Sequence, residues 1–249
     1  GDILVADGVP SGGPTPTAQI LRIDPATGSQ TLICEGGLLQ APYGMTLDSQ
    51  GNILVADPYY SVGGVSGAIL KINPATGVQS VAAVGPWIHS PMDVTFDSEG
   101  NMYVATTLPM GGFNGVGVVK IDALGNQSQI SSGSLPSWTG GIVVDASGTP
   151  FTSELYYYNG IFRINPSSGA QSVFSSGYPF QDPWDLAIDL DGNFVVVDGN
   201  MFGNGGLIRV NAVTGAKTVV TSGSLLVDPM DVAVVPRISD APWRVTVSW

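Results

Sequence analysis

The sequence predicts an all-β protein, a five-bladed β-propeller made of four-stranded antiparallel blades. A segment that begins with Gly and continues into an apolar run returns five times, starting at residues 1, 51, 100, 148 and 192. Intervals of 44 to 50 residues are typical of propellers and solenoids. The apolar runs are short and lack a 3.6-residue period, which excludes helical and leucine-rich repeats.

Each repeat contains four apolar runs separated by turn sequences. In the repeat over residues 42–84, the two tight turns contain Gly next to Asn or Thr, as expected for reversals between antiparallel strands. Four such strands in about 45 residues correspond to one propeller blade. The strands are expected at residues 44–48, 53–56, 68–72 and 78–82, and the turns at 49–52 and 73–77.

The chain begins at the second strand of a blade, and a fifth copy of the first strand occurs at residues 231–235. We therefore expect residues 231–235 to pair with residues 3–7 and close the ring, so that the two termini meet in one blade. Closure would remove open sheet edges. Residues 1–236 are expected to form a single domain, followed by an extension at 237–249.

Composition restricts the partners and the compartment. The chain has 249 residues and a net charge of −12, which disfavours nucleic acid as a partner. No apolar run is long enough to span a membrane. The single cysteine, Cys34, is expected to be a buried thiol. Only 11% of residues are charged, and this acidic, charge-poor composition favours an extracellular or periplasmic location.

Residues 91–105 resemble the NHL repeat, with Pro91 and the turn Asp97-Ser98-Glu99-Gly100-Asn101 before an apolar strand. The resemblance extends over all five repeats, to about residue 236. It implies a β-propeller, and it implies no particular chemistry, because similar propellers include binding modules, gluconolactonase-type lactonases and streptogramin lyases. Such relatives usually have six or seven blades, so five is a departure.

Five basic residues occupy one equivalent position in the third strand, and acids recur at the end of the second strand. The resemblance implies that they pair within each blade, and adjacent strands would bring them within reach. The alternative is a basic ring for an anionic ligand. The expected pairs are Asp7 with Arg22, Asp57 with Lys71, Glu154 with Arg163 and Asp198 with Arg209, while Thr106 stands where Lys120 would need an acid.

The tight turns share one face of the predicted propeller, so the variable loops share the other, where any functional site is expected. At the entrance of the innermost strand, Asp93, Asp185 and Asp231 replace the Gly that the family prefers. Three carboxylates at the mouth of the channel suit Ca²⁺. The alternative is that each carboxylate accepts hydrogen bonds from nearby backbone amides.

Aromatic residues gather on the same loops and crossovers, where they predict a surface for a protein or a glycan. Packing between blades is the alternative. The candidate ligand or partner residues are Tyr43, Trp87, His89, Trp138, Tyr156, Tyr157 and Trp184. The same crossovers and loops also carry Tyr59, Tyr60, Tyr158, Tyr178 and Phe180.

Two classes of function remain open. A non-enzymatic binding or scaffold module needs only a stable propeller with variable loops. The alternative is a metal-dependent lactonase or lyase with its site at the channel mouth, but His89 is the only histidine and the lactonase Glu has no matching position.

The alternating strand at residues 243–249 has no place in a five-blade count. It is expected either to pack within the chain or to join a neighbouring molecule and form a homo-oligomer. The residues assigned to this strand are Trp243, Val245, Val247 and Trp249.

Overall fold

The computed structural model is all-β and describes residues 3–7, 18–24, 27–62, 64–107, 116–132, 139–155, 158–223, 226, 229–234 and 245–248. It divides into two compact units, one of residues 1–112 and 118–129 and one of residues 113–117 and 130–249. Each unit is described by itself. The single domain over residues 1–236 stays a prediction.

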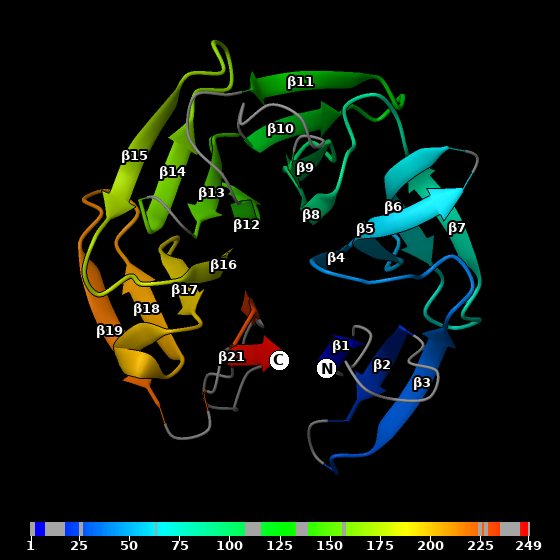
Figure 1. Cartoon of the computed structure of the whole chain (residues 1–249), viewed down its shortest axis with the longest axis horizontal. Helices are drawn as coiled ribbons and strands as arrows, with labels where there is room; N and C mark the ends of the chain where they lie inside the picture. Colours follow the sequence, from blue (N-terminus) through cyan, green and yellow to red (C-terminus); the bar gives the residue numbers. More distant parts are fainter. Residues whose placement is uncertain are drawn as a thin grey trace. The chain divides into compact units, whose positions relative to one another are not determined.

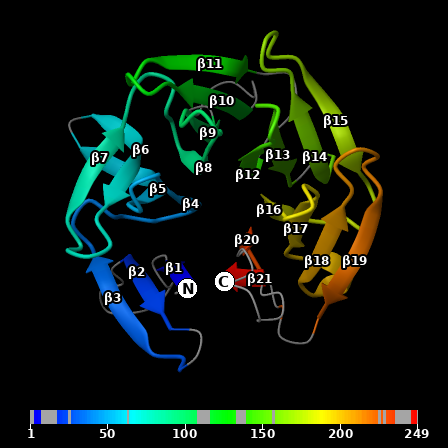
Figure 2. The ribbon, with the colours of Figure 1, turned by 180° about the vertical axis from the view of Figure 1, so that it is seen from behind.

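The first unit begins with two sheets whose strands follow one another in chain order (Figures 1 and 2). The first has three strands, β1 (Ile3–Asp7), β2 (Gln19–Ile23) and β3 (Gln30–Glu35). The second has four, β4 (Met45–Leu47), β5 (Ile53–Val62), β6 (Val65–Ile72) and β7 (Gln79–Ala83). The third has β8 (Pro91–Phe96), β9 (Met102–Thr107), β10 (Val116–Ile121) and β11 (Gln127–Ser132), and its residues 116–117 and 130–132 are grouped with the second unit.

The second unit contains two further four-stranded sheets and a pair of strands. The fourth sheet has β12 (Thr139–Val144), β13 (Pro150–Glu154), β14 (Gly160–Ile164) and β15 (Gln171–Ser176). The fifth has β16 (Pro183–Ile188), β17 (Phe194–Asp198), β18 (Gly206–Val210) and β19 (Lys217–Ser222), with a short 3₁₀ helix at Met201–Gly203. The remaining pair is β20 (Asp231–Val234) and β21 (Val245–Ser248).

The five successive sheets are the predicted blades, so the all-β, five-bladed propeller class is confirmed, with three strands in the first blade. The expected partner of the 231–235 segment is wrong. Strand β20 pairs with β21, from Asp231 opposite Ser248 to Val234 opposite Val245. The C-terminal strand therefore packs within the chain, one of the two alternatives, and self-assembly through it stays a prediction.

Residues 58–62 and 65–67 belong to strands rather than to the long loop expected from the sequence. Strands β5 and β6 continue past a register shift after Asp57 and pair again at Ser61–Ser66 and Val62–Val65. The two strands therefore form an extended hairpin. This hairpin carries Tyr59 and Tyr60 at its base.

The tight turns between the first and second strands form as expected from their sequence. Asp48 Oδ1 accepts hydrogen bonds from the backbone N–H groups of Gln50, at 2.9 Å, and Asn52, at 2.8 Å. Gly51 has a φ of +79°, which glycine adopts without steric cost. The Asp-x-x-Gly-Asn sequence is thus a local turn device.

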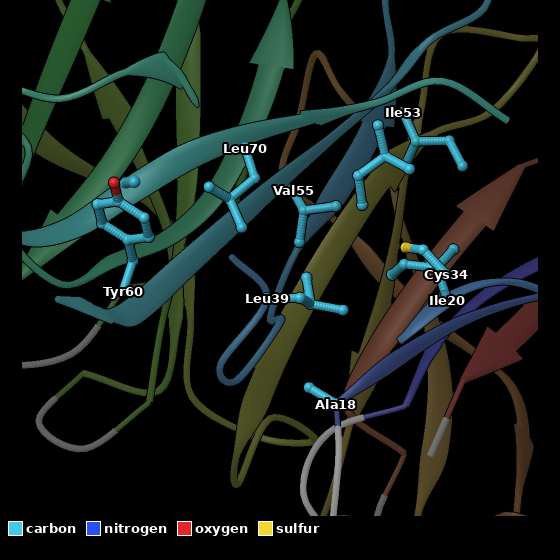
Figure 3. Packing of buried hydrophobic residues seen from close by; sticks show 10 residues of the cluster. Ala18, Ile20, Cys34, Leu39, Ile53, Val55, Tyr60 and Leu70 are labelled. Carbon is cyan, nitrogen blue, oxygen red and sulfur yellow. The ribbon is translucent and has the colours of Figure 1, made fainter. Parts of the chain in front are cut away.

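Apolar side chains of neighbouring sheets pack against each other within the first unit. Ile20 and Cys34 of the first sheet lie beside Ile53 and Val55 of the second (Figure 3). Cys34 is free and buried, as predicted, and burial raises the pKa of its thiol.

The backbones of successive sheets come close together at the turn between the third and fourth strands, which we call the inter-blade seam. A Cβ atom on Gly77 would lie 2.4 Å from the carbonyl oxygen of Ile33, and one on Gly169 would lie 2.3 Å from that of Ile130. No Cβ atom fits at such distances, so the approach requires glycine.

Side chains add hydrogen bonds to the inter-blade seam. The Ser131 hydroxyl donates to the carbonyl oxygen of Gly169 at 3.0 Å, and the Ser175 hydroxyl donates to that of Gly215 at 2.9 Å. Gln79 Nε2 donates to the carbonyl oxygen of Gly36 at 3.0 Å. The first residues of the later outer strands also reach the preceding sheet: Gln127 to Val84, Gln171 to Ser131 and Lys217 to Ser176.

No helix among the described residues has the length and apolar character needed to cross a membrane.

We expect Gly169→Ala to destabilise the protein more than Gly125→Ala. Both glycines have positive φ, +70° and +83°, so both substitutions incur a backbone cost of about 1–2 kcal/mol. Only Gly169 faces a backbone atom, whereas a Cβ atom on Gly125 meets nothing within 4 Å. Urea denaturation measures the difference in the free energy of unfolding. Equal losses in the two variants would show that the seam tolerates a methyl group.

Candidate functional site

The basic residues of the third strands pair with acids at the end of the first strands. Lys71 Nζ lies 2.9 Å from Asp48 Oδ2, and Arg209 Nε lies 2.6 Å from Asp189 Oδ2. Lys120 Nζ lies 3.6 Å from Asp97 Oδ2 at the corresponding position of the third sheet. The predicted pairing of Lys71 with Asp57 and of Arg209 with Asp198 is therefore wrong.

Strand register explains the correction. Lys71 lies opposite Leu54 of β5, three residues before Asp57. Side chains alternate between the two faces of a strand, so an odd separation places Asp57 on the other face as well as farther along. The same three-residue separation divides the other predicted pairs, because Arg22 lies opposite Leu4, Arg163 opposite Phe151 and Arg209 opposite Val195.

The ion pair at the short-turn end affects the titration of Asp48. Burial alone would raise the pKa of Asp48, but the contacts from Lys71, Asn52 and Gln50 outweigh burial and lower the pKa from 3.8 to about 2. The Asp97 carboxyl follows the same balance, and hydrogen bonds from Asn101 make its pKa lower than usual despite burial.

The acids at the end of the second strands anchor the loops that follow. Asp57 is fully buried, and its Oδ1 accepts hydrogen bonds from the backbone N–H groups of Tyr59, at 3.1 Å, and Tyr60, at 2.9 Å. Its Oδ2 accepts from those of Gln40, at 2.6 Å, and Ala41, at 3.1 Å. One carboxylate therefore fixes both the β5–β6 hairpin and the crossover that leads into the blade.

Glu154 has the same role in the fourth sheet. Its Oε2 accepts hydrogen bonds from the backbone N–H groups of Tyr158, at 2.8 Å, and Asn159, at 3.2 Å. Glu154 is buried, and it holds the backbone of the segment that carries Tyr158, a residue that is 38% exposed.

Asp198 has this role in the fifth sheet. Its carboxylate accepts from the backbone N–H groups of Gln181, at 2.8 Å, Asp182, at 3.1 Å, and Asn200, at 3.1 Å. Burial raises the pKa of Asp198, and these hydrogen bonds oppose the rise.

The Asp residues at the entrance of the innermost strands contact backbone of adjacent segments. Asp93 Oδ1 accepts from the backbone N–H of Val94 at 2.7 Å and lies against Gly44 of the preceding blade. A Cβ atom on Gly44 would be 2.0 Å from that oxygen. Gly44 N–H also donates to the Met92 carbonyl oxygen at 2.9 Å, so the two strand entrances are joined directly.

Asp185 repeats this arrangement. Its Oδ1 would lie 1.7 Å from a Cβ atom on Gly141, and its Oδ2 accepts from the backbone N–H of Val232 at 2.9 Å. The choice of Gly or Asp is therefore a match of sizes between successive blades, in which Gly44 makes room for Asp93 and Gly141 for Asp185. Sequence reasoning compared these positions as equivalents and missed that they are neighbours.

The described part of the chain contains no group of three or more His, Cys, Asp or Glu side chains that could hold a metal ion. The hydrogen bonds that Asp93 accepts from Val94 N–H and Asp185 accepts from Val232 N–H correspond to the backbone-binding alternative. Calcium binding by Asp93, Asp185 and Asp231 stays a prediction.

Several predicted surface aromatics are exposed. Trp87 is 42% exposed and Tyr59, on the β5–β6 hairpin, is 66% exposed. Tyr43, His89 and Trp184 are partly buried. Trp138, Tyr156, Tyr157, Trp243 and Trp249 lie outside the described residues, as do the side chains of Val245 and Val247.

Two further exposed tyrosines lie in the second unit, among the loop and crossover aromatics that the sequence indicates. Tyr178 is 75% exposed on the crossover before β16, and Tyr158 is 38% exposed next to its anchor Glu154.

Comparison with solved structures identifies the fold. The chain is similar to one in a nidogen/laminin complex, with a TM-score of 0.68 and 15% identity over 93% of this chain and 81% of that one. It is also similar to a gluconolactonase from Xanthomonas campestris, with a TM-score of 0.67 and 12% identity over 88% and 75%. Virginiamycin B lyase from Staphylococcus aureus matches with a TM-score of 0.59 and 16% identity over 93% and 78%.

The fold is a β-propeller. At 12–16% identity these likenesses concern the fold alone, and they agree with the propeller relatives that the NHL-like repeats imply. No protein-family profile matches the sequence. No curated protein matches it either.

We expect Asp48→Asn to remove a pH-dependent part of the stability. The folded-state pKa of about 2 is below the ordinary 3.8, so the stabilising charge is fully present above about pH 4 and is lost as the pH falls towards 2. Unfolding free energies of the wild type and the variant should differ most near neutral pH and converge at about pH 2. A difference that is constant from pH 2 to pH 7 would contradict the ion pair.

We expect Asp57 and Lys71 to act independently in a double-mutant cycle. Asp57→Ala should lower the free energy of unfolding by at least about 2 kcal/mol, because it leaves backbone donors unpaired. Lys71→Met should add its own smaller loss without coupling, since Lys71 pairs with Asp48. Urea denaturation of the four proteins measures the coupling, and a coupling energy above about 0.5 kcal/mol would restore the Asp57–Lys71 pairing.

Proposed function

We propose that the protein is a non-catalytic binding module whose partner docks on the loop end of the blades. The observation that carries this proposal is the combination of exposed aromatic rings with buried carboxylate anchors. Tyr59 follows its anchor Asp57 by two residues, and Tyr158 follows Glu154 by four. An exposed aromatic residue whose backbone is already fixed by hydrogen bonds loses little conformational entropy when it binds a partner.

The acids at the ends of the second strands are used for structure. Asp57 and Asp198 are fully buried and accept several backbone N–H groups, so neither presents a carboxylate to a ligand. A general acid or base must reach the reacting group. His89, the only histidine, lies on the crossover next to the exposed Trp87 and suits a contact surface.

The similar chain in the nidogen/laminin complex belongs to a propeller of a protein–protein complex. That example supports a binding role for this fold, with a protein or a glycan as the partner. A charged fraction of only 11% and a net charge of −12 favour an extracellular or periplasmic place of action.

A binding screen with matched variants tests the proposal. We expect a panel of immobilised glycans and peptides to contain at least one ligand whose affinity falls at least tenfold when Tyr59, Trp87, Tyr158 and Tyr178 are all changed to Ala. The control changes Leu32, Val81, Val173 and Val219 to Ala, since these exposed side chains lie on the outer strands. The control should retain binding, and circular dichroism should show both variants folded.

Two outcomes would overturn the proposal. One is that no ligand in the panel depends on the four aromatic residues. The other is lactone hydrolysis that requires Ca²⁺ and disappears in Asp93→Asn or Asp185→Asn, which would favour the enzymatic alternative.

A further inference from the structure

Three aromatic side chains of the first unit come from three segments that meet at the base of the β5–β6 hairpin. Tyr43 lies beside β5, because its backbone N–H donates to the Ala56 carbonyl oxygen at 2.9 Å. Tyr59 lies three residues after Ala56 in the same strand, so Tyr43 and Tyr59 adjoin the same part of β5. Burial, and to a lesser extent Tyr59, raises the pKa of Tyr43. We call Tyr43, Tyr59 and Trp87 the aromatic patch.

Trp87 is brought to this region by contact between its crossover and β6. A Cβ atom on Gly67 would lie 2.8 Å from the Ser90 backbone nitrogen, so the crossover runs directly against β6 there. The register shift of β5 between Asp57 and Ser61 lies opposite Gly67, and Tyr59 is within that shift. The segments that carry Tyr59 and Trp87 therefore adjoin the same point of β6.

Both exposed rings stand on fixed backbone. The Tyr59 N–H is bonded to the buried Asp57 carboxylate. Ile88, next to Trp87, is fully buried in the core between the second and third sheets, and its N–H donates to the Gly85 carbonyl oxygen at 3.1 Å. The patch thus has a fixed backbone and contains two solvent-exposed aromatic residues.

The segments around the patch carry almost no charge. Residues 35–43, 58–67 and 84–92 contain no Lys and no Arg, and their ionisable side chains other than tyrosine and cysteine are Glu35 and His89. A phosphate, sulfate or carboxylate ligand would need a cation, which this end of the blade does not supply. The anchor Asp57 is buried, so a basic ligand finds no carboxylate in the patch itself.

The exposed apolar groups at this end are aromatic. The exposed aliphatic side chains described in the first unit, Leu32, Leu47, Val78, Val81 and Leu124, lie on outer strands, at a strand end or in short turns. A standard protein interface buries about 800 Å² on each partner around an apolar core. Two exposed aromatic side chains, one with a phenol and one with an indole group, are instead matched in size and polarity to sugar rings.

We propose that the aromatic patch binds a neutral glycan, with pyranose rings against the faces of Tyr59 and Trp87 and hydroxyl groups bonded at the ring edges. This inference rests on the proposed binding function and names the class of partner for the first unit. An uncharged ligand also agrees with a chain whose net charge of −12 repels acidic polysaccharides.

Titration calorimetry with defined probes tests the inference. The neutral probes are the hexasaccharides of cellulose, xylan, laminarin and mannan, and the charged probes are hexagalacturonate and hexalysine. We expect at least one neutral hexasaccharide to bind, with affinity unchanged between 50 and 500 mM NaCl in the absence of ion pairing. Trp87→Ala and Tyr59→Ala should each weaken that binding about tenfold.

Leu124→Ala is the control, because Leu124 is a strongly exposed apolar residue of the first unit that lies in the short turn between β10 and β11, away from the loop end. It should leave affinity unchanged, and all three variants should keep the wild-type melting temperature within a few degrees. The glycan inference is overturned if no neutral hexasaccharide binds, or if the binding does not depend on Tyr59 and Trp87.

The two proposals fail in different ways. Binding of hexalysine, hexagalacturonate or a peptide through Tyr59 and Trp87 would overturn the glycan assignment and leave the binding function standing. Absence of any ligand that depends on Tyr59, Trp87, Tyr158 or Tyr178 would overturn both.

Discussion

The approach of a glycine turn to the backbone of the preceding sheet is the constraint on which the rest of the structure depends. At Gly77 and Gly169 the backbone comes so close to a carbonyl oxygen that a side chain has no space. Sheets packed at this distance leave no room for water between their apolar faces, and the adjacent hydroxyl and amide side chains satisfy the polar atoms that become buried. The recurring glycines therefore have two different origins: Gly51 and its equivalents face open space and are needed for their positive φ, whereas Gly77 and Gly169 are also needed because the preceding sheet leaves no room for a side chain.

Charge is separated along each blade in a way that follows from this packing. The cations of the third strands pair with Asp48, Asp97 and Asp189 near the short turns, where the ions keep partial contact with water. The acids at the opposite end are buried, and backbone N–H groups replace their hydration. In the described part of these blades, the ion pairs of Lys71, Lys120 and Arg209 lie at the turn end. At the loop end, the buried acids form hydrogen bonds with the peptide backbone.

The repeats identify the fold from the sequence because turn chemistry and strand periodicity are local properties. The Asp48–Asn52 turn forms as its residues indicate. Ion-pair partners depend on the register between neighbouring strands, which the sequence alone does not reveal. The sequence therefore suggested Asp57 as the partner of Lys71, whereas the structure pairs Lys71 with Asp48. The role of Asp185 was equally hidden, because its counterpart Gly141 is 44 residues away and becomes a neighbour only when the blades pack.

The carboxylate anchors have a consequence for how such a protein can change its specificity. Asp57 lies in a strand and holds Gln40, Ala41, Tyr59 and Tyr60 through backbone atoms alone. Main-chain hydrogen bonds do not depend on which side chain the held residue carries. The side chains at the contact positions can therefore be exchanged, by evolution or by an engineer, without loss of the hydrogen bonds that hold their backbone, so that specificity can change while the fold stays the same.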